Sequence, residues 1–181
     1  GLIAHYRAVA EASEIPVVLY NVPGRTGCDL LPETVAVLSS HENIIGLKES
    51  VADESRWQAL YPLASPHFSL LSGDDQTFVS SMAGGAQGVI SVASNAVPAT
   101  FARICRYISE HNFDAAQALD ERLQELYAFL GVEPNPVPVK AIMKLMGFGH
   151  GLRLPLLPLS DDYTGKADEM ADLCKTIEQS M

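Results

Sequence analysis

Lys48 is the residue of this sequence with the clearest potential for chemistry. It lies in IIGLKES, residues 44–50, where the apolar side chains predict a buried strand. Side chains alternate across a strand, so Lys48 and Glu49 point to opposite faces and one of them faces an interior. Desolvation there favours the neutral amine, which can attack a ketone and form a Schiff base. The alternative is a strand-end lysine that reaches solvent or a carboxylate.

Tyr20 and Arg25 favour the catalytic interpretation. Tyr20 lies at a comparable height in the preceding predicted strand, and its phenol could relay protons. Arg25 follows in the loop GRTG, where its planar guanidinium suits a substrate carboxylate. Each also has a common structural explanation, because strand tyrosines are usually core residues and loop arginines are usually solvated. The convergence of the three residues therefore matters more than any one of them.

The elements that hold these residues alternate between strands and helices. Apolar and β-branched runs predict four strands, and a helical pattern follows each of them. The strands are expected at 17–23, 44–50, 68–75 and 88–94. Strands separated by helices of this length form parallel βαβ units. Beyond residue 96 the pattern is helical, with helices expected at 101–111, 113–130, 137–147 and 164–181.

Four parallel strands could form an open doubly wound sheet or part of a closed barrel. In a β/α barrel, catalytic side chains lie at the carboxyl ends of strands and in the loops that follow. Tyr20, Arg25, Lys48, Gly73 and Ser94 all occupy such predicted positions. A complete (β/α)8 barrel needs about 250 residues.

The expected fold is therefore α/β, the C-terminal half of a (β/α)8 TIM barrel followed by a C-terminal helical region. Residues 1–95 are expected to form the second half of the barrel. Residues 96–181 are expected to form the last barrel helix and the helical region.

Composition excludes several classes of function. The net charge of −10 disfavours binding to a phosphate backbone, so no nucleic-acid partner is expected. No apolar run approaches the roughly 20 residues of a membrane span, and no leader resembles a signal peptide. We therefore expect no membrane partner and a cytoplasmic location. Cys28, Cys105 and Cys174 have no CxxC spacing, which indicates reduced thiols that act as small buried side chains.

No metal is expected, because the five histidines are scattered singly. Asp74 and Asp75 lie at a strand-to-helix junction, where capping of the helix explains them better than metal binding. The stretch GFGHG at 147–151 lacks the preceding strand of a dinucleotide-binding motif.

Five motifs carry a resemblance to a known family. In chain order they read YNVPGRTGCDLLPET, IIGLKES, LLSGDD, GGAQGVISV and VEPNPVPVK. Together they resemble the pyruvate-dependent class I aldolase family of dihydrodipicolinate synthase and N-acetylneuraminate lyase. The resemblance implies a lyase that condenses pyruvate with aspartate semialdehyde to 4-hydroxy-tetrahydrodipicolinate in lysine and diaminopimelate biosynthesis.

The same resemblance implies roles for individual residues. Lys48 would form the imine with pyruvate, Tyr20 would relay protons and Arg25 would bind the carboxylate of aspartate semialdehyde. Gly73 and Ile90 match positions that line the pyruvate pocket, with Ile90 contributing its backbone. The lysine imine is itself the electron sink, so no cofactor is implied. The family further implies a homotetramer and an N-terminal barrel half that supplies hydroxyl groups to the proton relay.

Two other functions remain open from the sequence. A sibling aldolase that cleaves N-acetylneuraminate or a keto-deoxy sugar acid shares the lysine and tyrosine strands, although such lyases generally lack an arginine in the GRTG context of Arg25. The second open function is that of an inactive barrel fragment that only binds partners. We expect the 181-residue chain alone to be inactive, because a half barrel exposes apolar strand edges at both ends of its sheet.

Overall fold

A computed structural model describes residues 1–180 of the chain. The chain forms two compact units, Gly1–Ile90 and Ser91–Met181. The first unit contains a parallel sheet with helices, and the second is helical. The predicted α/β class, with parallel strands first and helices after them, is therefore confirmed.

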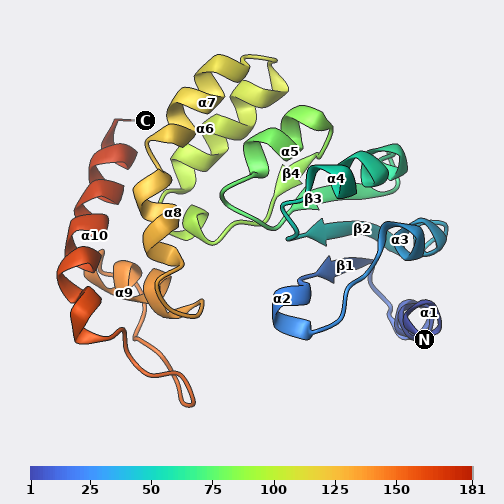
Figure 1. Cartoon of the computed structure of the whole chain (residues 1–181), viewed down its shortest axis with the longest axis horizontal. Helices are drawn as coiled ribbons and strands as arrows, with labels where there is room; N and C mark the ends of the chain where they lie inside the picture. Colours follow the sequence, from blue (N-terminus) through green and yellow to red (C-terminus); the bar gives the residue numbers. More distant parts are fainter. Residues whose placement is uncertain (181) are drawn as a thin grey trace. The chain divides into compact units, whose positions relative to one another are not determined.

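The first unit is a sheet of four parallel strands in the order β1-β2-β3-β4 (Figure 1). The strands are β1 (Val17–Asn21), β2 (Ile44–Glu49), β3 (Ser69–Ser72) and β4 (Gly88–Val89). The helices are α1 (Leu2–Ala12), α2 (Pro23–Thr26), α3 (Pro32–Leu38), α4 (Glu54–Leu60) and α5 (Phe78–Gly84), with a 3-10 turn η1 (Tyr61–Leu63). Strand and helix thus alternate through residues 1–90, which is the arrangement that parallel pairing requires.

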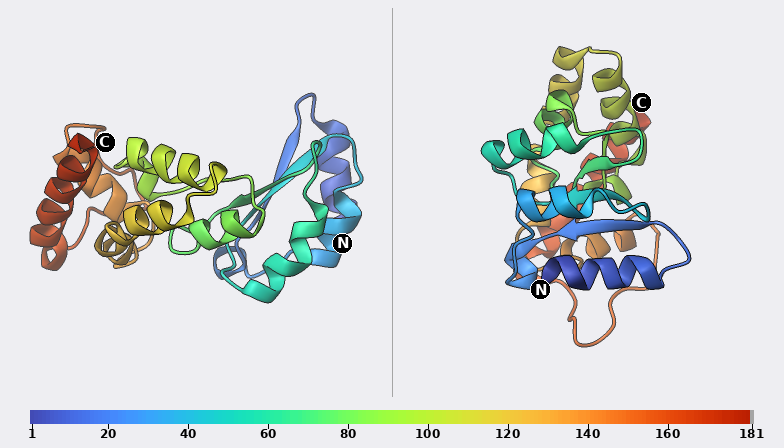
Figure 2. Two further views of the ribbon diagram at one scale, coloured as in Figure 1. Left: turned by 90° about the horizontal axis from the view of Figure 1, so that it is seen from above. Right: turned by 90° about the vertical axis from the view of Figure 1, so that its right-hand side faces the viewer.

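The core of this unit lies between one face of the sheet and the helices α1, α3 and α4 (Figures 1 and 2). Leu19, Leu47 and Leu70 are paired in register across three strands, and each exposes 1% or less of its surface. Alternation along β1 turns Val18 and Tyr20 to the other face, where they expose 42% and 44%. Within this unit the sheet therefore has one packed face and one open face.

The strands are shorter than predicted. β1 ends at Asn21 because Pro23, which lacks a backbone N–H, begins α2. β4 retains only Gly88 and Val89, although the N–H of Ile90 still donates to the carbonyl of Ser72 at 2.8 Å.

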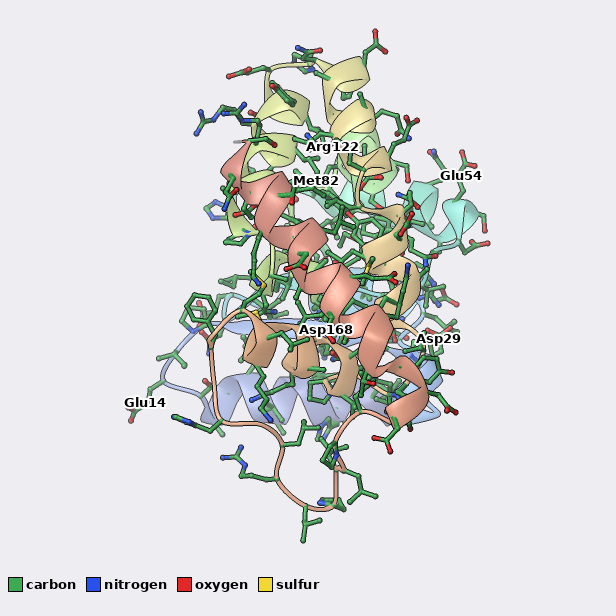
Figure 3. All side chains as sticks on the ribbon, turned by 90° about the vertical axis from the view of Figure 1, so that its left-hand side faces the viewer. Glu14, Asp29, Glu54, Met82, Arg122 and Asp168 are labelled. Atoms are coloured by element: carbon green, nitrogen blue, oxygen red, sulfur yellow. The ribbon has the colours of Figure 1, made fainter. Side chains whose placement is uncertain are left out.

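The second unit contains the helices α6 (Pro98–Ser109), α7 (Phe113–Glu121), α8 (Gln124–Leu130), α9 (Val137–Leu145) and α10 (Thr164–Gln179), with 3-10 turns η2 (Ala93–Asn95) and η3 (Asp161–Tyr163). Figure 3 views this unit from the side of α10, which packs against α6, α8 and α9. Near the end of α10, the carboxylate of Glu178 accepts hydrogen bonds from Ala99 N at 3.0 Å, Thr100 N at 2.9 Å and Thr100 Oγ1 at 2.6 Å. It thereby caps the N-terminus of α6.

The single helix predicted for 113–130 is wrong. The chain turns at Arg122, which is labelled in Figure 3, and forms α7 and α8 instead. Asp120 is buried there, and its side chain accepts hydrogen bonds from Tyr127 Oη at 2.8 Å and Gln124 Nε2 at 3.2 Å. Leu123 N donates to the carbonyl of Asp120 at 2.9 Å, a tight turn that a straight α-helix does not contain.

No helix within residues 1–180 combines the length and the apolar character that a membrane span needs.

The three cysteines are free thiols in different environments. Cys174 is buried and Cys105 is partly buried, but Cys28 is exposed on the segment after β1, so the expectation that it is buried is wrong. Burial, reinforced by the charge of Glu178, raises the pKa of Cys174 to about 11.

We expect iodoacetamide at pH 8 to alkylate Cys28 and to leave Cys174 unmodified while the protein is folded. A thiol with a pKa near 11 is ionised in only about one molecule in a thousand at that pH, and burial also blocks access. Peptide mass spectrometry before and after addition of denaturant measures both sites. Rapid alkylation of Cys174 in folded protein would contradict the packing of α10.

Candidate active site

Lys48 and Tyr20 lie side by side on the open face of the sheet. They are register partners at the carboxyl ends of β2 and β1, which confirms the expectation that they lie at comparable height. Lys48 Nζ is 4.2 Å from the centroid of the Tyr20 ring, a distance at which the aromatic face attracts an ammonium group. Lys48 is half-buried, so its amine is partly shielded from water but still accessible from the open face.

Gly73 leaves the space that the Lys48 side chain occupies. It follows β3, and its N–H donates to the carbonyl of Glu49 at 2.7 Å. A Cβ atom at this position would lie 2.7 Å from Lys48 Cε and would also collide with Ser50 Oγ. Ser50 Oγ in turn donates to the carbonyl of Gly73 at 3.2 Å. The strand end after β3 is therefore shaped around the lysine.

The other predicted site residues also lie at this edge of the sheet, with one exception. Arg25 is exposed on α2, directly after β1 (Figure 1). Ile90 is exposed at the end of β4, and its N–H is engaged with Ser72, so a backbone contact to a ligand there would use its carbonyl oxygen. Ser94 is the exception, because it lies in η2, within the segment between β4 and α6, and belongs to the second unit.

Glu49 points to the face opposite Lys48, as strand alternation predicts, and its side chain is buried. Arg56 from the first turns of α4 forms an ion pair with it, with 3.1 Å between Arg56 Nη1 and Glu49 Oε2. Asn21 Nδ2 donates to both carboxylate oxygens at 3.0 and 3.1 Å. Val51 N donates to Glu49 Oε1 at 2.8 Å. The buried carboxylate thus has donors on both of its oxygens, as burial of a charge requires.

The same cluster reaches the end of the segment that carries Arg25. Arg56 Nη2 forms an ion pair with Asp29, and Arg56 Nη1 also donates to the carbonyl of Leu30 at 3.2 Å. Asn21 Nδ2 donates to Asp29 Oδ1 at 2.9 Å, and Asn21 Oδ1 accepts from Leu30 N at 2.9 Å. We call the five residues Asn21, Asp29, Leu30, Glu49 and Arg56 the anchor cluster.

For each of the two acids of the anchor cluster, Glu49 and Asp29, burial raises the pKa and hydrogen bonding lowers it. Burial raises the pKa of Glu49, and the donors from Val51, Asn21 and Arg56 do not cancel this effect. Burial would also raise the pKa of Asp29, but the hydrogen bonds from Asn21 and Arg56 outweigh it and hold that pKa below its ordinary value. Asp29 is the more exposed of the two, which is why its donors prevail.

Sequence reasoning did not include Asn21 and Arg56 among the functional residues. One signal pointed to them, because a glutamate in an apolar strand needs a partner once it is buried. An arginine seven residues later, in the next helix, is such a partner. Asn21 follows Tyr20 directly, so its side chain points to the face where Glu49 lies.

A threonine stands at the start of α5, where Asp74 or Asp75 was predicted as the cap. Thr77, not an aspartate, is the N-cap residue of α5, and Asp74 Oδ2 accepts a hydrogen bond from Thr77 Oγ1 at 2.7 Å. The prediction that an aspartate of this pair is the N-cap residue is therefore wrong, and Asp74 instead contacts the threonine that holds that place. Within the described part of the chain, no three histidine, cysteine, aspartate or glutamate residues gather closely enough to hold a metal ion.

Comparison with known proteins gives consistent matches. The model of the Dihydrodipicolinate synthetase family matches residues 1–174. A 4-hydroxy-tetrahydrodipicolinate synthase of Stenotrophomonas maltophilia strain K279a is 56% identical over 94% of this chain and 58% of its own length. The enzyme of the same name from Xanthomonas campestris pv. campestris is 54% identical over 94% of this chain and 57% of its own. This chain therefore spans less than two thirds of the relatives that it matches.

Solved structures match equally well. A chloride-inhibited dihydrodipicolinate synthase of Acinetobacter baumannii, in complex with pyruvate, aligns with a TM-score of 0.90 and 37% identity over 97% of this chain and 60% of its own. The 4-hydroxy-tetrahydrodipicolinate synthase of Methylacidiphilum fumariolicum SolV aligns with a TM-score of 0.90 and 35% identity over 99% of this chain and 61% of its own.

Substitution Arg56→Met should destabilise the protein by about 3–5 kcal/mol near neutral pH, because it leaves the buried Glu49 carboxylate without its cationic partner. The raised pKa of Glu49 means that the folded state holds its proton more tightly than the unfolded state does, so stability falls as pH rises through the folded pKa. The stability that Arg56→Met removes should therefore become smaller as pH is lowered and Glu49 becomes neutral.

Urea unfolding at two pH values measures this difference. The control is Lys166→Met, which breaks the exposed ion pairs of Lys166 with Glu125 and Glu169 and should leave the midpoint unchanged. Equal midpoints for Arg56→Met and the unaltered protein would show that Glu49 does not need its partner.

Proposed function

This chain belongs to the dihydrodipicolinate synthetase family, and we propose that it forms the imine-bearing part of a lyase that condenses pyruvate with aspartate semialdehyde to 4-hydroxy-tetrahydrodipicolinate. The observation that carries the proposal is the juxtaposition of Lys48 with Tyr20, with Gly73 holding the space beside them open. The pyruvate in the A. baumannii relative supports the choice of keto acid.

The first half of the reaction uses Lys48 and Tyr20. The Nζ lone pair of Lys48 attacks the keto carbon of pyruvate and gives a carbinolamine, which loses water to form the imine. Tyr20 relays protons to and from the carbinolamine oxygen, since its ring lies against the amine. Loss of a methyl proton then gives an enamine, with the protonated imine nitrogen as the electron sink. No metal or organic cofactor enters these steps.

The second half joins the two substrates. The enamine carbon attacks the aldehyde carbon of aspartate semialdehyde and forms the new carbon–carbon bond, and the aldehyde oxygen takes up a proton. The amine of the acceptor then displaces Lys48 and closes the ring. Arg25, exposed on α2 after β1, is placed to bind the acceptor carboxylate through its planar guanidinium. The Ile90 carbonyl is a backbone contact for pyruvate; Ile90 follows β4, the strand farthest in the sheet from β1 and Arg25.

Further parts of the proposal concern the assembled protein. We infer that it contains an N-terminal barrel half, is a homotetramer and works in the cytoplasm, as the family resemblance implies. Within residues 1–90, β1 and β4 are the edge strands, which is where a second barrel half would pair. The sugar-acid lyase alternative is not favoured, because the matched relatives are named 4-hydroxy-tetrahydrodipicolinate synthase.

Borohydride reduction in the presence of pyruvate should trap an adduct on Lys48 in the protein that carries both barrel halves. Peptide mass spectrometry locates the adduct, and Lys48→Arg is the control, because a guanidinium does not form this imine. We expect the 181-residue chain alone to remain unmodified, since its sheet has open edges. No adduct in folded full-length protein would refute the imine mechanism.

Substitution Gly73→Ala should lower the rate of imine trapping by at least about tenfold, because the added Cβ would displace the Lys48 side chain. Gly165→Ala in α10 is the matched control, since a Cβ at that position meets nothing within 4 Å. Single-turnover trapping with pyruvate compares the two variants. Equal rates would mean that Lys48 does not depend on the space at Gly73.

A further inference from the structure

The segment that carries Arg25, residues 22–31 and here called the Arg25 loop, is held at both ends by the anchor cluster. At its start, Asn21 donates to both oxygens of Glu49. At its end, the backbone of Leu30 bonds to Asn21 and to Arg56, and Asp29 pairs with Arg56. Asn21 and Leu30, nine residues apart, are thus both joined to the buried Glu49–Arg56 ion pair.

Hydrogen bonds within the Arg25 loop connect its residues to one another. Gly27 N donates to the carbonyl of Pro23 at 2.9 Å, and Gly27 adopts a φ of 65° that favours glycine. Thr26 Oγ1 donates to the carbonyl of Cys28 at 2.8 Å and accepts from Cys28 N at 3.3 Å. Because the interior is linked in this way, a shift of the anchored ends carries Arg25 with it.

Lys48 is positioned by different contacts. Its backbone is held in the ladder between β1 and β3, where its register partners are Tyr20 and Leu71. Its side chain lies on the open face against Tyr20 and Gly73, and the Glu49 carboxylate lies on the opposite face. The anchor cluster therefore includes the end of the Arg25 loop itself, and it touches Lys48 only through the strand that Lys48 shares with Glu49.

Arg56 suits this task because of its shape. One guanidinium nitrogen contacts both Glu49 and the Leu30 carbonyl, and the other contacts Asp29. A planar group with donors on two nitrogens can bridge three acceptors, whereas the compact ammonium of lysine cannot span them in the same geometry. Arg56 itself exposes only 9% of its surface, so water does not readily replace these contacts.

We propose that the buried Glu49–Arg56 pair is a positioning device that sets the Arg25 loop relative to Lys48, and that it thereby governs use of the carboxylate-bearing aldehyde and not formation of the pyruvate imine. This inference rests on the proposed function. Glu49 and Arg56 are positioning residues here, since they act through the loop and not on the reacting atoms. Misplacement of a binding group by about 1 Å can cost on the order of a hundredfold in rate.

The test uses Arg56→Lys and Asp29→Asn in the protein that carries both barrel halves. Arg56→Lys keeps the charge and loses the bridge, and Asp29→Asn removes only the anion at the loop end, which folds more safely because Asp29 is partly exposed. Glu178→Gln is the matched control, a carboxylate that also accepts three hydrogen bonds but lies in the second unit.

We expect Arg56→Lys to raise the KM for the aldehyde by at least about tenfold, and to leave the KM for pyruvate and imine trapping within about twofold. Asp29→Asn should act in the same direction with a smaller effect. Glu178→Gln should change neither KM. Hydrogen–deuterium exchange should rise in residues 22–31, which lose their attachment, and stay unchanged in 44–49, whose backbone is held between β1 and β3 in both anchor variants.

Three results would overturn the inference: unchanged aldehyde KM in folded variants, a parallel loss of pyruvate trapping, or unchanged exchange in residues 22–31. The first would separate the loop from acceptor use, and the second would indicate general support of the strand. Failure of the proposed function has a different signature, which is the absence of imine in the unaltered protein. In that case hydrogen exchange still decides whether the Glu49–Arg56 pair holds the Arg25 loop.

Discussion

The buried carboxylate of Glu49 is the constraint on which the candidate site depends. A charge at the end of an apolar strand is stable only if donors surround it, and here those donors come from a side chain of β1, a backbone N–H after β2 and a guanidinium of α4. Each donor is also part of a segment next to the site. Satisfying one charge therefore ties together the loops that follow two neighbouring strands.

Because side chains alternate along each strand, the candidate catalytic residues lie on one face of the sheet and the packed core lies on the other. On one face, leucines from three strands pack against helices and form a rigid base. On the other face, Lys48 and Tyr20 meet in an open environment. Adjacent residues of β2, Lys48 and Glu49, belong to the two faces, so the reactive amine and the carboxylate that anchors the loops are separated by the backbone itself. This explains why a glutamate beside the lysine does not become its ion-pair partner.

Family membership and site geometry support each other from independent directions. The family model matches residues 1–174, and the relatives are longer proteins, of which this chain spans 58% in S. maltophilia and 57% in X. campestris. The geometry concerns only local contacts within residues 1–90, and it brings an amine, a phenol and a glycine together at the edge of a parallel sheet where β/α enzymes place their reacting groups. The second unit contributes its own helical core, capped at α6 by Glu178.

The sequence by itself determined the alternation of strands and helices, the parallel sheet, and the equal height of Tyr20 and Lys48, because these follow from periodicities of two and 3.6 residues and from strand length. Motif order identified the family. Only the tertiary structure decided that Arg56 pairs with Glu49, that Asn21 joins both loops, that Cys28 is exposed and that the chain bends at Arg122. Those features depend on which side chains become buried and which hydrogen-bond partners they then find, and these requirements outweigh local propensity.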